Sequence, residues 1–97
     1  MPMYVGLYKF TAKGVGDMKT LPERAKESSK AWEAMGGKTI AVLTTIGQYD
    51  MVTVGEGPSD EMAATFAAGL AARGYVTTET LRAFTMEECA GLLAKLA

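Results

Sequence analysis

The sequence predicts an α+β fold of the ferredoxin-like type, in which helices pack on one face of an antiparallel four-stranded sheet. Four segments are rich in β-branched or alternating apolar residues, which is typical of strands. Three segments place apolar residues at helical spacing behind capping residues. The resulting order is β-α-β-β-α-β-α, and two split β-α-β units joined by a hairpin give this fold. The strands are expected over residues 3–10, 39–46, 49–54 and 75–84.

The first strand, over residues 3–10, is apolar or aromatic on both faces. Val5 and Leu7 alternate with Tyr4, Gly6, Tyr8 and Phe10. A sheet with one face in water would show a cleaner polar alternation. We therefore expect both faces of the sheet to be covered, one by helices and the other by something else.

Capping residues mark where the three helices begin. Thr20 and Thr85 each have a glutamate three positions later, which is the pattern of a capping box. Ser59 is a natural N-cap for the middle helix. Gly36 and Gly74 follow the first two helices, and glycine readily adopts the left-handed conformation in which helices often end.

The first helix has a packing face that the spacing of its residues reveals. This face consists of Ala25, Ser28, Trp32 and Met35. Arg24 and Lys26 lie mostly elsewhere on the helical wheel, so we expect them at solvated positions.

A β-hairpin is predicted in the middle of the chain, with Gly47 and Gln48 as its loop. A two-residue loop with glycine first suits a type II′ turn, because Gly47 adopts a positive φ without strain. This loop pairs Thr44 with Met51 and continues the ladder towards the tip. Tyr49 follows the loop at once, at an end of the sheet where a ligand could meet it.

A second copy of the chain is the simplest cover for the face of the sheet that the helices leave open. We expect this face to carry Tyr8, Phe10, Thr44 and Met51. An apolar patch of this kind in water favours a two-fold dimer in which two sheets face each other. The space between the two sheets would hold a small ligand near the hairpin of residues 47–50.

Composition limits the possible functions. The chain has 97 residues, 48% of them hydrophobic, and a net charge of −1, which indicates one folded domain over residues 1–97. Such a balance provides no basic stripe for nucleic acid. The chain has no histidine, which excludes a histidine-ligated zinc or haem and a Ser–His pair, and we expect neither metal nor cofactor. One cysteine, no signal peptide and no apolar run long enough for a membrane fit a cytoplasmic protein.

Six motifs are spread over nearly the whole chain: Met1-Pro2-x-Tyr4-Val5, Phe10-Thr11-x-x-Gly14, Pro22-Glu23-Arg24-Ala25-Lys26, Gly36-Gly37-Lys38, Gly47-Gln48-Tyr49-Asp50 and Thr78-Glu79-Thr80-Leu81-Arg82-Ala83-Phe84. In these motifs the chain resembles the GYD-domain family of small bacterial and archaeal proteins. The resemblance implies a dimeric α+β barrel, an architecture shared by monooxygenases, isomerases, haem proteins and effector-binding modules. It supplies no reaction. The hairpin is also similar, more loosely, to the effector-binding domain of leucine-responsive regulators, although this chain has no DNA-binding helix-turn-helix segment.

Five side chains are candidates for a ligand site, and each has a structural alternative. Asp50 could grip an ammonium group or act as a base, or its carboxylate could accept backbone N–H groups in the turn. Tyr49 and Tyr8 could contact a ligand, or they could be packed rings, Tyr8 in a dimer core. The Gln48 amide could recognise a ligand by hydrogen bonds, or it could lie exposed at the loop tip. Arg82 could clamp a carboxylate or form a salt bridge at the surface.

Three classes of function follow. The first is a dimeric module that binds a small molecule near the Gly47–Asp50 hairpin. The second is an enzyme of the monooxygenase-like or isomerase-like type that needs no cofactor. The third is a structural accessory protein that forms oligomers and holds no ligand. A polar-tipped cavity would favour the first two, and an ionisable group with a perturbed pKa inside it would favour an enzyme.

Overall fold

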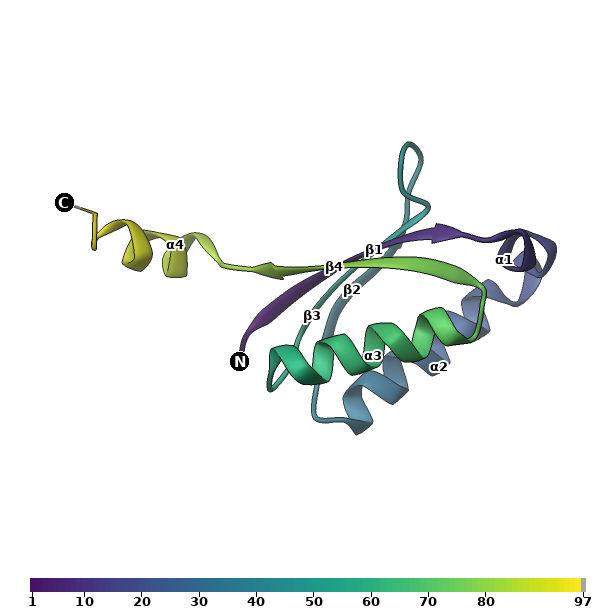
Figure 1. Cartoon of the computed structure of the whole chain (residues 1–97), viewed down its shortest axis with the longest axis horizontal. Helices are drawn as coiled ribbons and strands as arrows, with labels where there is room; N and C mark the ends of the chain where they lie inside the picture. The colour runs from purple at the N-terminus through teal and green to yellow at the C-terminus, as the bar shows by residue number, and fades with distance from the viewer. Residues whose placement is uncertain (97) are drawn as a thin grey trace.

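A computed structural model, which describes residues 1–96, has the α+β architecture that the sequence predicts (Figure 1). Its elements are β1 (Met3–Phe10), α1 (Ala12–Gly16), the 3-10 turn η1 (Met18–Thr20), α2 (Leu21–Ala34), β2 (Lys38–Thr44), β3 (Met51–Glu56), α3 (Asp60–Ala72), β4 (Val76–Ala83) and α4 (Met86–Leu93). The strands form one antiparallel sheet in the order β2-β3-β1-β4, and α2 and α3 lie together on one side of it. This is the ferredoxin-like arrangement.

Two of the three predicted helix caps are present. The Ser59 hydroxyl accepts a hydrogen bond from the Met62 N–H at 3.2 Å, and Thr85 forms a complete capping box with Glu88. The capping box at Thr20 is wrong, because the turn η1 leads directly into α2. Thr20 has nearly helical backbone angles there, and its hydroxyl donates to the Asp17 carbonyl oxygen at 2.9 Å instead.

The hairpin pairs in the predicted register but has a longer tip. Thr44 lies opposite Met51, as expected, and the two strands end at these residues. Beyond them residues 45–50 form a loop, closed by a 2.9 Å hydrogen bond from the Thr45 N–H to the Asp50 carbonyl oxygen. Gly47 has a φ of 114° in this loop, which explains why glycine is needed there.

The prediction of which sheet face the helices leave open is wrong. Tyr8 and Met51 point towards α2 and α3 and are almost completely buried, while Phe10 is half-buried and Thr44 is exposed. Strand alternation fixes which residues share a face, but it does not say which face the helices cover. The open face carries Val5, Leu7, Leu43, Val52 and Leu81.

Trp32 is the centre of the core. Its indole packs edge-on against Phe66 and Tyr4, with ring centroids 5.0 and 6.3 Å away. A Cβ atom on Gly57 would lie 2.7 Å from the indole, and one on Gly55 would lie 3.1 Å from its nitrogen. The glycines therefore let the end of β3 and the loop before α3 approach the ring.

The C-terminal helix α4 stands away from the rest of the molecule. Figure 1 shows it beyond the end of β4, at the extremity of a chain that measures 52 × 30 × 19 Å. Its apolar side chains are in solvent, with Met86 79% and Leu93 57% exposed. An eight-residue helix is marginal by itself in water, so this helix lacks the packing that would hold it.

Candidate functional site

A partly open cavity of about 260 Å³ lies between the sheet and the two helices α2 and α3. The sheet forms its floor with alternate residues of β1 and β3, and the facing sides of α2 and α3 form its walls. Most of its lining is aromatic or aliphatic, with a few polar groups at defined places. This is the usual make-up of a pocket for a small organic molecule, in which apolar contacts supply affinity and polar groups fix orientation.

The floor of the cavity carries a paired phenol and hydroxyl. The Tyr8 hydroxyl lies 3.0 Å from Thr53 Oγ1, across the β1–β3 ladder. The ring can lie along the strand because position 6 is glycine, and a Cβ atom there would overlap the Tyr8 hydroxyl. Burial raises the pKa of Tyr8, and the hydrogen bond between Tyr8 and Thr53 opposes this shift with a smaller effect. Tyr8 therefore stays protonated near neutral pH and can donate a hydrogen bond.

One end of the cavity is aromatic. Trp32, Phe66 and Tyr4 line it, and Ala63 of α3 is buried beside them. The Tyr4 hydroxyl donates to Asp60 Oδ1 at 2.6 Å, at the first residue of α3. Burial, and then the hydrogen bond and the negative charge of Asp60, raise the pKa of Tyr4 to about 12. This phenol, like that of Tyr8, stays neutral at physiological pH.

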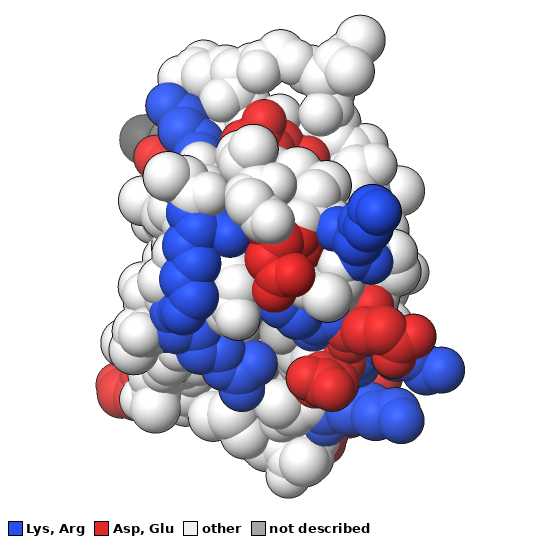
Figure 2. Space-filling view, turned by 90° about the vertical axis from the view of Figure 1, so that its right-hand side faces the viewer, with Lys and Arg blue, Asp and Glu red and all other residues white. Residues whose placement is uncertain are grey.

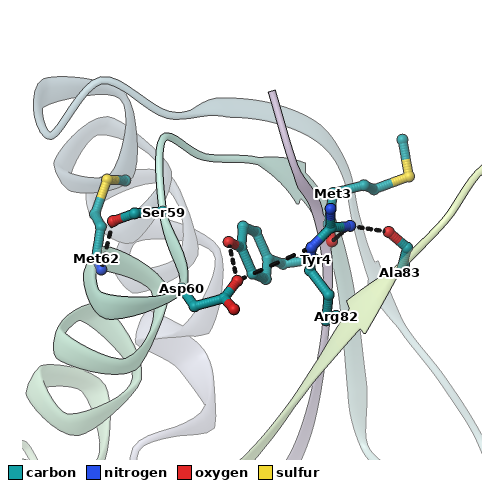
Figure 3. A network of polar contacts seen from close by, with 7 residues as sticks. All are labelled: Met3, Tyr4, Ser59, Asp60, Met62, Arg82 and Ala83. Atoms are coloured by element: carbon teal, nitrogen blue, oxygen red, sulfur yellow. Dashed lines mark hydrogen bonds and ion pairs between the residues drawn. The ribbon is translucent and has the colours of Figure 1, made fainter.

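Arg82 belongs to the same polar network as Tyr4 (Figure 3). Its Nε lies 3.9 Å from Asp60 Oδ1, and its Nη1 donates to the carbonyl oxygens of Met3, at 3.4 Å, and of Ala83. Its guanidinium also stacks 4.4 Å from the centroid of the Phe84 ring. The contacts within the chain match the salt-bridge alternative for Arg82, and such an exposed pair contributes little to stability.

The opposite end of the cavity is basic. Arg24 of α2 and Arg73, which follows α3, both line it. The Arg24 guanidinium stacks 4.1 Å from the centroid of Tyr75, and the Lys13 ammonium lies 4.4 Å from the same ring. The end of the molecule near α1, seen in Figure 2, carries Lys and Arg side chains interspersed with Asp and Glu.

The placement of Arg24 is the main feature that the sequence missed. The residue was expected in solvent, but it is half-buried and held by two hydrogen bonds, to Thr20 Oγ1 at 3.0 Å and to the Asp17 carbonyl oxygen at 2.9 Å. A signal was present, because position 24 is two steps of four residues before Trp32. Side chains four residues apart share a helix face, so Arg24 shares the face of the buried indole.

The hairpin residues lie elsewhere. Gln48 is exposed at the loop tip. The Tyr49 hydroxyl donates to Glu79 Oε2 at 2.7 Å, and this hydrogen bond raises the pKa of Tyr49. Lys9 lies over the same ring, 5.5 Å from its centroid. Because Lys9 and Glu79 alternate with residues of the helix-covered face, Tyr49 sits over the open face of the sheet, opposite Tyr8.

Asp50 joins the hairpin to the first strand. Its Oδ2 accepts a hydrogen bond from the Phe10 N–H at 2.8 Å, and its own N–H donates to the Tyr8 carbonyl oxygen at 2.8 Å. The carboxylate thus has a structural role, but its donor is a backbone N–H at the end of β1 and not one of the turn N–H groups that the sequence suggested.

Of the five predicted ligand-site residues, only Tyr8 lines the cavity. Gln48, Tyr49 and Asp50 lie at the hairpin, and Arg82 lies beside Asp60. Within residues 1–96 no group of three acidic or cysteine side chains is placed to hold a metal ion. None of the helices in this range is both long and apolar enough to cross a bilayer.

The family model described as "GYD domain" matches residues 4–93. A curated protein of Thermus thermophilus, named "Glutamine synthetase and cystathionine beta-lyase binding protein", is 34% identical over 97 residues, which cover 99% of each chain. No solved structure gives a significant match.

Proposed function

The chain belongs to the GYD domain family, and we propose that it binds a small organic molecule in the cavity between its sheet and its helices. The observation that supports this most directly is the cavity of about 260 Å³ itself. A small domain closes such a space with side chains unless something else fills it, because unfilled apolar volume costs stability. The sequence predicted a ligand site between the sheets of two subunits. The proposed site lies instead on the helix side of the sheet within one chain.

Retained ligand is the direct test of this proposal. Native mass spectrometry of the protein purified from its own host should show a bound small molecule. Ala67 lines the cavity, whereas Ala68 is exposed beside it on α3. Ala67→Phe should fill the cavity and abolish the bound mass, and Ala68→Phe should keep it. A wild-type protein without any bound mass, or equal loads in the two variants, would contradict the proposal.

Binding is favoured over catalysis by the chemistry of the lining. The phenols of Tyr4 and Tyr8 both have raised pKa values and remain protonated near neutral pH. They can orient a ligand by hydrogen bonds, but a general base works best when its pKa lies near the operating pH. The enzyme that needs no cofactor therefore ranks behind the binding protein.

We also propose that the chain works as a cytoplasmic homodimer through its open sheet face. Leu43 is 54% and Leu81 is 44% exposed on that face, and α4 extends beyond it with its own apolar residues in solvent. A second copy would cover these groups. Leu81→Glu should convert the dimer into a monomer in sedimentation equilibrium, and a wild-type monomer at micromolar concentration would refute the proposal.

A second candidate function is the binding of a metabolic enzyme. The name of the Thermus thermophilus relative supports it, because the two chains match from end to end. If this chain also binds glutamine synthetase, the glutamine synthetase purified from its own host should co-elute with it on size-exclusion chromatography. A chain shortened before Met86, which lacks the exposed helix α4, would show whether that helix takes part. Separate elution of the two intact proteins would exclude this candidate.

A further inference from the structure

We propose that the cavity is built for an organic carboxylate with an apolar tail, whose carboxylate binds at Arg24 and whose tail lies against Trp32. This inference rests on the proposed binding function and adds the chemical class of the ligand. It follows from three properties of the cavity, which are its charge, its free hydrogen-bond donors and its length.

The charge of the lining favours an anion with a single charge. The charged residues that line the cavity are Arg24, Arg73 and Glu27, so the lining carries one net positive charge. Among residues 1–96 no carboxylate lies within 4.0 Å of either guanidinium, and Lys13 adds a further cation beside Tyr75. Positive groups gathered around one ring repel one another, so an anion among them would relieve that repulsion.

Arg24 is prepared to receive such an anion. Its Nε and Nη2 donate to Thr20 Oγ1 and to the Asp17 carbonyl oxygen, and the Tyr75 ring supports the plane of its guanidinium. A guanidinium has five N–H donors, and within residues 1–96 its Nη1 makes no hydrogen bond. A side chain fixed in this way loses little entropy when it binds a carboxylate, whose two oxygens match the planar fork.

The other end of the cavity suits an apolar tail. Trp32 and Phe66 present ring surfaces there, and Tyr8 offers the phenol of the floor between the two ends. Arg24 and Trp32 are eight residues apart on one helix, which corresponds to about 12 Å along its axis at about 1.5 Å per residue. A carboxylate on a chain of medium length spans this distance.

Octanoate and its neutral counterpart 1-octanol are suitable probes. Trp32 is the one tryptophan of the chain and lines the cavity, so its fluorescence reports occupation directly. We expect octanoate to bind about tenfold more tightly than 1-octanol, since charged hydrogen bonds are the stronger ones. Arg24→Gln should reduce the affinity for octanoate to that for the alcohol. Lys26→Gln, on the exposed side of the same helix, should leave both affinities unchanged.

The alcohol also shows whether a variant keeps its cavity. If Arg24→Gln loosens the contact with Tyr75, 1-octanol binding falls too, and Arg73→Gln then tests the charge at the same end of the cavity. Equal binding of the two probes to the wild-type protein would overturn the carboxylate inference and leave the binding function intact. A Trp32 fluorescence that responds to neither probe would overturn both.

Discussion

Replacing Asp50 with alanine should destabilise the fold, because the Asp50 carboxylate accepts the Phe10 N–H at 2.8 Å. Hydrogen bonds to charged groups contribute about 1.5–3 kcal/mol when buried. Asp50 is half-buried and water can replace part of the bond, so we expect a loss of about 1–2 kcal/mol. A domain of this size loses about 4–8 °C in Tm per kcal/mol, which gives a decrease of about 4–16 °C.

Thermal unfolding followed by circular dichroism, at equal protein concentrations, measures this change. Asp50→Asn keeps one acceptor oxygen and should fall between the wild-type protein and the alanine variant. Gln48→Ala is the matched control, since Gln48 is exposed two positions away in the same loop and should change Tm little. If Asp50→Ala has the Tm of the wild type but binds the retained ligand more weakly, Asp50 serves the ligand and the structural reasoning is refuted.

Three other variants test the cavity and its surroundings. Gly6→Ala should cost about 1–3 kcal/mol in urea unfolding, because the new Cβ atom would overlap the Tyr8 hydroxyl, and an unchanged midpoint would contradict this packing. Trp32→Ala should cost about 3–5 kcal/mol and remove most of the cooperative thermal transition, whereas a retained transition would show a different core. The pKa of Tyr4 is raised from 10.0 to about 12, so its contribution to stability is complete below pH 10 and is lost as pH rises towards 12. Tyr4→Phe should weaken that alkaline loss of stability, and an identical pH profile for the two proteins would argue against the buried phenol.

The cavity changes how the family's hairpin motif is understood in this chain. Residues 47–50 of the hairpin do not line the cavity, and two of them tie the loop to the sheet. Asp50 fastens the loop to β1, and Tyr49 folds over the open face to reach Glu79. If two open faces meet in a dimer, as we propose, Tyr49 would lie close to the contact between the subunits.

The sequence by itself determined the order of the four strands and of the helices α2, α3 and α4, and where most of them begin or end, but its predicted order lacks α1 and η1. These properties depend on neighbours in the chain, such as the Ser59 cap, the box formed by Thr85 with Glu88, and the register that pairs Thr44 with Met51. Local preferences of this kind act over a few residues, so a pattern in the sequence reports them directly. At Thr20 the same reasoning failed, because the preceding turn η1 already satisfied the threonine hydroxyl.

Only the tertiary structure decided what faces the cavity. Strand alternation separates Tyr8 from Val5, but the side that the helices cover depends on the packing of Trp32 against glycines far along the chain. The helical spacing puts Arg24 on the same face of α2 as Trp32, but only the tertiary structure brings Tyr75, fifty-one positions later, under its guanidinium. The Asp50 carboxylate accepts its hydrogen bond from the backbone N–H of Phe10, forty positions earlier. Contacts between such distant residues form when the whole chain folds, and no local pattern in the sequence encodes them.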